Sequence, residues 1–177
     1  MLGGRRIADH ALSALRAVTT TQLIVANDPA AARWFPGARI IADETPGLGP
    51  LAGIATALHA AGGAAVLVVA WDMPFVTPAL LGELRASGER GASAVVPVHG
   101  TGARVEPLCA WYGAGSLQSC RALLDAGERR AVALFEALTE AVAIGDDALA
   151  RFGDASRLFT SVDTPVRLAE LGGTLDD

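Results

Sequence analysis

The sequence predicts a single α/β domain over residues 1–177, in which helices cover both faces of a mainly parallel sheet. First, β-type segments alternate with helical ones through most of the chain. Second, residues 64–70 (AAVLVVA) contain no polar side chain, which is typical of a strand buried on both faces. Third, three consecutive predicted strands end on a polar residue: Asn27, Asp43 and Asp72.

Composition indicates a globular protein and argues against several classes. Hydrophobic residues make up 51% of the chain and charged residues 19%, which excludes a disordered chain. The net charge is −5 and no basic cluster exceeds a pair such as Arg129–Arg130, so we expect no nucleic-acid binding. All 14 basic residues are arginine, which excludes a Schiff-base or P-loop lysine within these residues.

The apolar segments predict a protein that does not enter a membrane. The longest apolar run, residues 60–71, is too short to span a bilayer. The first twenty residues contain no continuous apolar block, so we expect no secretory leader there and a cytoplasmic location. Cys109 and Cys120 have no metal-type spacing and are expected to be free thiols.

Four elements are expected in the first 45 residues. Apolar residues at helical spacing predict a helix over 7–16. Branched apolar residues predict strands over 21–26 and 39–42. Pro36–Gly37 ends a short helix, over 30–35, between these strands.

The segment ETPGLGPLAG then leads into a longer helix. Pro50 suits the first helical turn, and Gly62–Gly63 end the helix. Gly49 and Gly53 leave room for a ligand beside the backbone, and the helix start offers N–H groups to an anion. The alternative is a flexible connection whose glycines only permit tight packing.

The second half of the chain continues the alternation. Thr77 and Pro78 are expected to begin a helix. Strands over 93–98 and 106–112 flank a glycine-containing turn, which allows a hairpin-like excursion. His99 in that turn is expected to be solvated. The remaining elements are helices over 116–126 and 131–138, a strand over 141–144, a segment over 159–162 that leads into Thr164, and a last helix over 165–171.

The polar strand ends suggest a site. Carboxyl ends of parallel strands share one edge of a sheet, where open α/β folds bind ligands. Asn27, Asp43, Asp72 and the N–H groups near Gly49 would converge there, which suggests Mg²⁺ bridging to a polyphosphate. The alternative for Asp72 is that it merely opens the turn before Pro74.

Six strings along essentially the whole chain carry a family resemblance. They are GGRRIADHAL at 3–12, VAND at 25–28, PGLGPLAGIATAL at 46–58, VVAWDMPFVTP at 68–78, EPLCAWY at 106–112 and SVDTPVRLAELG at 161–172. With these strings the sequence resembles the molybdenum cofactor guanylyltransferases, which transfer GMP from GTP to molybdopterin. GPLAG and DMPF together, in this order and spacing, are specific. The resemblance implies a Rossmann-like nucleotidyltransferase domain of the nucleotide-diphospho-sugar-transferase fold.

The resemblance also implies roles for individual residues. Asp72 would be the catalytic residue and the Mg²⁺ ligand. The residues expected to contact the guanine nucleotide are Asn27 and Asp43, with Gly49, Pro50, Leu51 and Gly53 beside it. Asp163 would lie on the pterin side, although SVDTP replaces the two asparagines of the family's NxNTP-like segment. The implied partners are GTP, molybdopterin and, transiently, proteins that make or accept the molybdenum cofactor.

The sequence departs from the family pattern at two places. Trp71 stands where a small residue, often cysteine, is usual. Gly3–Arg6 match the segment just after the family's first strand and glycine-rich loop (LAGGxSxRMGxDK), which are missing from these residues. We therefore expect a gap between the strands at 21–26 and 64–70, and little transferase activity. Two alternatives remain: a non-catalytic nucleotide- or partner-binding remnant, and a cytidylyltransferase, although Met73 resembles the guanylyltransferase pattern.

Overall fold

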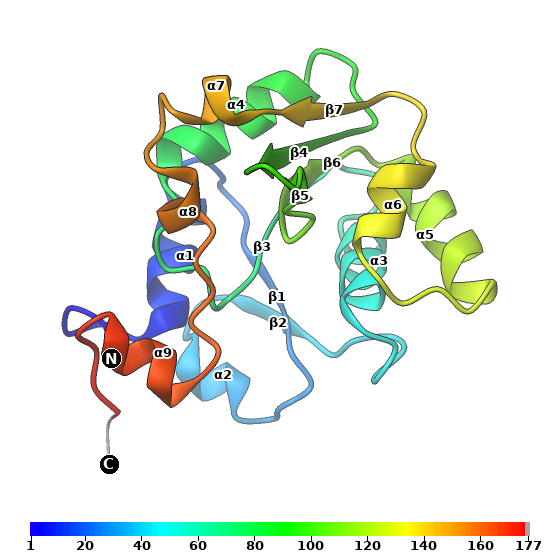
Figure 1. The fold of residues 1–177 in the computed structure, drawn as a ribbon. Helices are drawn as coiled ribbons and strands as arrows, with labels where there is room; N and C mark the ends of the chain where they lie inside the picture. The colour runs from blue at the N-terminus through cyan, green and yellow to red at the C-terminus, as the bar shows by residue number, and fades with distance from the viewer. Residues whose placement is uncertain (176–177) are drawn as a thin grey trace.

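The computed structural model describes residues 1–175 (Figure 1). The helices are α1 (Ile7–Arg16), α2 (Ala31–Trp34), α3 (Pro50–Ala60), α4 (Pro78–Gly88), α5 (Ser116–Asp125), α6 (Val132–Ala137), α7 (Asp146–Leu149), α8 (Ala155–Leu158) and α9 (Pro165–Glu170). The strands are β1 (Leu23–Val25), β2 (Arg39–Ile41), β3 (Val66–Val69), β4 (Ala94–His99), β5 (Arg104–Val105), β6 (Cys109–Tyr112) and β7 (Ala141–Ile144). The expected alternation of strands and helices is confirmed.

In the larger sheet the strands pair in the order β3-β6-β4-β5, and β7 also pairs with β4. The expectation of a mainly parallel sheet is wrong, because β6 lies antiparallel between β3 and β4 and β5 is antiparallel to β4. The glycine-containing turn after β4 reverses the chain, as expected, and the reversal lets β6 insert. Since β7 is parallel to β4, strands β3, β4 and β7 all point the same way. Their carboxyl ends therefore share one edge of the sheet.

Helices cover both faces of this sheet, so the expected three-layer arrangement is confirmed (Figure 1). Side chains alternate along β3 because successive residues of a strand point to opposite faces. Val66 and Val68 pack with α3, α5 and α6, whereas Leu67 and Val69 pack with α1 and α4. Each face thus has its own hydrophobic core.

The smaller sheet consists of β1 and β2, which pair in parallel with Leu23 opposite Arg39. Within residues 1–175, β1 and β3 do not pair, in agreement with the expected gap between these strands. Helices pack against both faces of β3, as expected, yet all four of its residues are only half-buried, so the expected full burial is wrong. The reason is that β3 pairs with β6 alone among these residues, which leaves its other edge open.

The two ends of the chain pack together. Leu2 forms a small hydrophobic cluster with Val162 and Leu168 of the C-terminal part. Residues 159–162 form no regular strand in the structure; instead they run past the end of β3. Cys109 and Cys120 are free and buried, as expected. Among the helices of residues 1–175, none has the length and apolar character to cross a membrane.

Candidate active site

The turn after β3 fixes Asp72. The Ala70 N–H donates to the Leu108 carbonyl at 2.7 Å, and Met73 is buried in the core. The Asp72 carbonyl accepts the Val162 N–H at 2.8 Å, and its Oδ2 accepts a hydrogen bond from the Ser161 hydroxyl. Asp72 is therefore more than a turn opener, because a segment from the other end of the chain holds both its backbone and its carboxylate.

The predicted meeting of Asn27 and Asp43 is confirmed. The Asn27 Oδ1 accepts the Asp43 N–H at 2.9 Å. The Asp43 Oδ1 accepts the Thr56 hydroxyl at 2.9 Å and the Thr45 N–H at 3.2 Å. Thr56 also accepts the Glu44 N–H at 3.1 Å. One oxygen of Asp43 is thus committed to holding the loop, and Oδ2 is the atom left for a ligand.

Thr56 is a site residue that the sequence reasoning missed. Its side chain is 2% exposed on a helix that is otherwise apolar around it. A buried hydroxyl needs a hydrogen-bond partner. A single threonine within an apolar helical segment is therefore the sequence signal that could have indicated Thr56.

The start of α3 is less open to an anion than expected. Gly49 has φ 79°, and a Cβ there would lie 3.1 Å from the Arg129 carbonyl oxygen. The same carbonyl accepts the Leu51 N–H at 3.4 Å, while Pro50 has no N–H to offer. Leu51 is fully buried, so its side chain cannot touch a ligand. Gly53 is half-buried, and a Cβ there would meet nothing within 4 Å.

An ionic contact fixes the loop that lies against α3. The Glu128 carboxylate accepts a hydrogen bond from the Arg130 guanidinium. It also accepts the backbone N–H groups of Arg130 and Arg129. These donors lower the pKa of Glu128 to about 2. The Glu128 carboxylate thus ties together the loop whose Arg129 carbonyl accepts the Leu51 N–H.

A second polar cluster lies on the edge that carries Asp72. The expectation that His99 is solvated is wrong: only 13% of its side chain is exposed. Its Nε2 lies 2.9 Å from Oε1 of the buried Glu106, which also pairs with Arg104 at 2.9 Å. The His99 ring stacks on Phe159, with centroids 4.9 Å apart. No spacing pattern in the sequence indicates this cluster, because three separate segments build it.

Asp163 lies two residues beyond the hydroxyl that binds Asp72, and it is exposed. Thr164 accepts the Arg167 N–H and caps α9, as expected for this position. The contact of Asp163 with a pterin stays a prediction.

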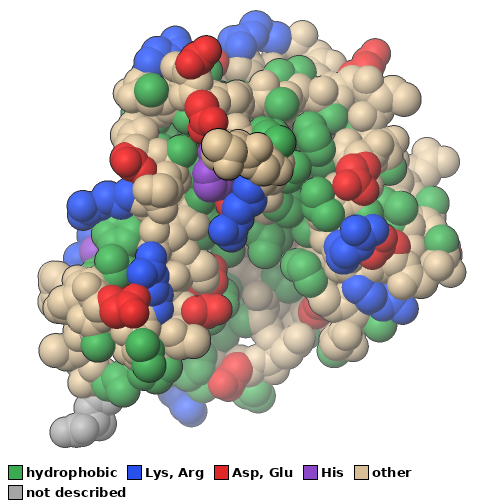
Figure 2. Space-filling view, in the orientation of Figure 1, with side chains coloured by type: hydrophobic (Ala, Val, Ile, Leu, Met, Phe, Trp, Pro, Cys, Tyr) green, Lys and Arg blue, Asp and Glu red, His purple; other side chains and the backbone are tan. Residues whose placement is uncertain are grey.

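The structure thus places the predicted site residues in two halves. Figure 2 shows a hollow in the middle of one face, over the space between β3 and the β1–β2 pair of Figure 1, with hydrophobic side chains on its walls. One half contains Asn27 and Asp43, and the other contains Asp72. No hydrogen bond within residues 1–175 joins the two halves directly.

The donor set of the second half fits a magnesium ion shared with a substrate. Magnesium usually takes one or two protein carboxylates and completes its shell with phosphate oxygens and water. Asp72 retains Oδ1 for such an ion, because Ser161 binds Oδ2. Within residues 1–175, no three His, Cys, Asp or Glu side chains are grouped to hold a metal without a substrate.

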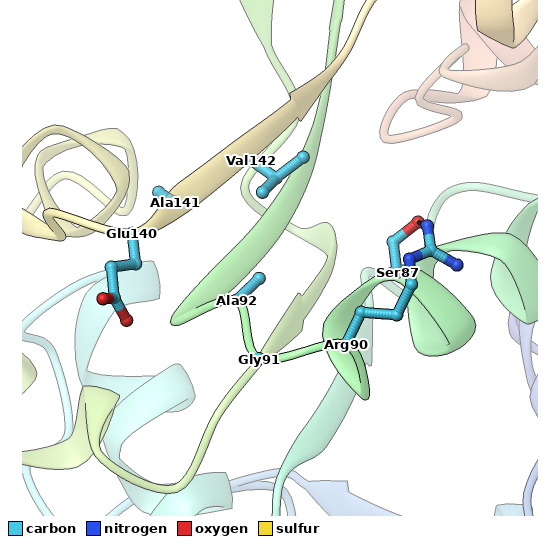
Figure 3. A pocket seen from close by; sticks show the side chains of 7 residues that line it. All are labelled: Ser87, Arg90, Gly91, Ala92, Glu140, Ala141 and Val142. Carbon is cyan, nitrogen blue, oxygen red and sulfur yellow. Dashed lines mark hydrogen bonds between the residues drawn. The ribbon is translucent and has the colours of Figure 1, made fainter.

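Two pockets lie elsewhere on the molecule. One, of about 410 Å³, lies at the amino ends of β4 and β7 beside Arg90 and Glu140 (Figure 3). It is therefore at the edge of the sheet opposite Asp72. The other, of about 180 Å³, lies between Thr56 and Arg121 behind the Asp43 loop. It is smaller than the hollows of about 300–1,000 Å³ that bind most small ligands.

This fold and these strand-end carboxylates define an α/β nucleotidyltransferase fold. The chain belongs to the family described as the MobA-like NTP transferase domain, which matches residues 1–142. A crystal structure titled molybdopterin-guanine dinucleotide biosynthesis protein A, from Archaeoglobus fulgidus, is similar over 97% of this chain and 86% of that one. Its TM-score is 0.78 and its sequence identity 27%.

Sequence relatives carry related names. A probable molybdenum cofactor guanylyltransferase of Chloroflexus aggregans is 35% identical over 127 residues, which cover 72% of this chain and 61% of the relative. A molybdenum cofactor guanylyltransferase of Shewanella halifaxensis is 29% identical over 97% of this chain and 82% of its own length. The chain thus spans about three fifths of the length of the first curated relatives it matches.

Proposed function

We propose that this protein transfers GMP from GTP to molybdopterin and releases pyrophosphate. In this reaction a phosphate oxygen of the acceptor attacks the α-phosphorus of GTP. The bond from that phosphorus to the bridging oxygen breaks, and pyrophosphate takes the electron pair. The observation that carries the proposal is Asp72, a carboxylate fixed at the carboxyl end of β3 within a MobA-like domain.

Asp72 would hold Mg²⁺, which, when bound, neutralises charge on the phosphates. The residues of the chain supply positioning. Ser161 donates to one carboxylate oxygen of Asp72 and directs the other toward the substrate. Positioning is most of what a phosphoryl transfer needs, because its transition state is loose.

The Asn27–Asp43 pair would bind the guanine nucleotide. The Asp43 Oδ2 can accept a hydrogen bond from an N–H of the guanine ring, and the Asn27 amide can donate one. Because Oδ1 already accepts two hydrogen bonds, Asp43 would bind the base through one oxygen. Asp163 would accept from the pterin on the opposite side of Asp72.

A non-catalytic nucleotide- or partner-binding module is the second candidate. The observation that favours it is the Leu51 N–H, which donates to a protein carbonyl and is not offered to a phosphate. In this reading the protein would bind a guanine nucleotide without transferring it.

The test is transfer of label from GTP labelled at the α-phosphate to molybdopterin, with CTP as the competing donor. We expect weak GTP-dependent labelling, in line with the low activity expected from the sequence, and we expect Asp72→Asn to reduce it at least a hundredfold. Asp147→Asn, at an exposed carboxylate on α7, is the matched control and should transfer normally. Binding of GTP without any transfer would refute the proposed transferase activity and favour the non-catalytic binding module. Equal transfer from CTP would overturn the guanine specificity.

A further inference from the structure

Trp71 is a large apolar side chain that the fold leaves uncovered. Its side chain is 63% exposed, against 46% for Trp34 and 8% for Trp111. It belongs to none of the three hydrophobic clusters, although its chain neighbours Ala70 and Met73 pack in the first of them. Tryptophan is on average a well-buried residue, so an exposed indole at a site needs an explanation.

The backbone that carries this indole is held on both sides. The Ala70 N–H donates to Leu108, the Met73 N–H donates to the Ala70 carbonyl at 3.3 Å, and the Asp72 carbonyl accepts from Val162. A rigid aromatic on a fixed turn binds with little loss of conformational entropy, since only two side-chain torsions need ordering. The turn is therefore built to present one flat apolar surface.

We propose that the Trp71 indole is a stacking platform for a fused heteroaromatic ring bound beside Asp72. Two rings in the proposed reaction have this chemistry, guanine and pterin, and both carry a 2-amino-oxo-pyrimidine edge. Such an edge offers N–H donors, and the exposed carboxylate of Asp163 lies one residue beyond the Val162 N–H that binds the Asp72 carbonyl. A stacking face and an acceptor therefore lie on the two segments that meet at Asp72.

This inference rests on the proposed function, because it names the substrate part that this same site binds. Stacking of a base on an aromatic side chain contributes enough to change affinity by about 5- to 150-fold. The effect should be confined to ligands with a fused ring.

The experiment is calorimetric titration of the whole chain with GMP, UMP and 6-hydroxymethylpterin, each with Mg²⁺. In Trp71→Leu we expect the dissociation constant for GMP or for the pterin to rise about 5- to 150-fold. The ligand whose binding weakens identifies the ring that stacks. Trp34→Leu, at the other exposed indole, is the matched control and should bind as the wild type does.

A fluorescence measurement separates stacking from loss of structure. In the Trp34→Leu background, Trp71 is the remaining exposed indole, so the stacking ligand should protect it from acrylamide quenching. Unchanged affinities in Trp71→Leu, or an equal loss for UMP, would overturn the platform while leaving the proposed function standing. If the wild type bound neither GMP nor the pterin, the platform would fall, whereas the proposed function is decided by the transfer of label from GTP.

Discussion

Replacing Thr56 by valine should loosen the Asp43 loop while keeping the shape of the core. The hydroxyl donates to Asp43 Oδ1 at 2.9 Å and accepts the Glu44 N–H at 3.1 Å. The side chain is 2% exposed and packs in α3, so valine fits the space but offers neither contact. The change therefore isolates two hydrogen bonds that join a helix to the predicted base-binding loop.

The magnitude follows from the partners. A hydrogen bond to a charged group contributes about 1.5–3 kcal/mol to stability. Glu44 is exposed, so its N–H can bind water and adds little to the loss. We expect Thr56→Val to lower the free energy of unfolding by about 1.5–3 kcal/mol, out of a typical total of about 5–15 kcal/mol. For a domain of this size the melting temperature should fall by about 3–12 °C.

Urea unfolding and calorimetry measure this loss, and Thr56→Ser provides the matched control. Serine keeps the hydroxyl and removes one methyl group, which should cost about 1 kcal/mol. In a double-mutant cycle with Asp43→Asn, the two positions should couple by about 0.5–3 kcal/mol. A Thr56→Val protein as stable as Thr56→Ser, with no coupling to Asp43, would refute the reasoning.

Three further outcomes are expected. Ser161→Ala should reduce GMP transfer about 10- to 100-fold by releasing the carboxylate of Asp72, with little change in melting temperature; unchanged turnover would contradict this. Gly49→Ala should lower the free energy of unfolding by about 1–3 kcal/mol, because φ is 79° and the new Cβ would lie 3.1 Å from a carbonyl oxygen. Gly53→Ala, which has open space around its Cβ, should not lower it. Urea titration compares the two variants. Burial raises the pKa of the Cys109 thiol above its ordinary 9.0, so the unfolded state loses this proton at a lower pH than the folded state does. The free energy of unfolding should therefore fall as pH rises above about 9. Urea titrations across pH should show a shallower fall for Cys109→Ala.

The carboxyl ends of parallel strands lie side by side, and this rule alone predicted half of the candidate site from the sequence. Asn27 and Asp43 follow two strands that pair in parallel, and parallel pairing alone brings their next residues together. The same rule cannot place these residues against Asp72, because β1 and β3 do not pair. The local sequence pattern therefore predicts which residues meet only where the strands that carry them pair directly.

Contacts between distant segments explain what the sequence could not show. The apolar run before Asp72 was correctly predicted as a strand, but its burial depends on which strands lie beside it. His99 is expected to be solvated because it lies in a turn, yet Glu106 and Phe159 cover it from other segments. Such burial arises from tertiary packing, which neither residue type nor spacing encodes.

The two halves of the site depend on different parts of the chain. The Asp43 half is held by α3, which lies inside the region that matches the family, residues 1–142. The Asp72 half is held by Ser161 and Val162, which lie beyond that region. Ser161 also departs from the asparagine that the resemblance leads one to expect. A serine hydroxyl donates a single hydrogen bond, so it can orient one oxygen of Asp72 and leave the other for a metal. The departure from the family pattern is therefore compatible with the function proposed for Asp72, and the contact comes from the C-terminal segment, which the family match does not include.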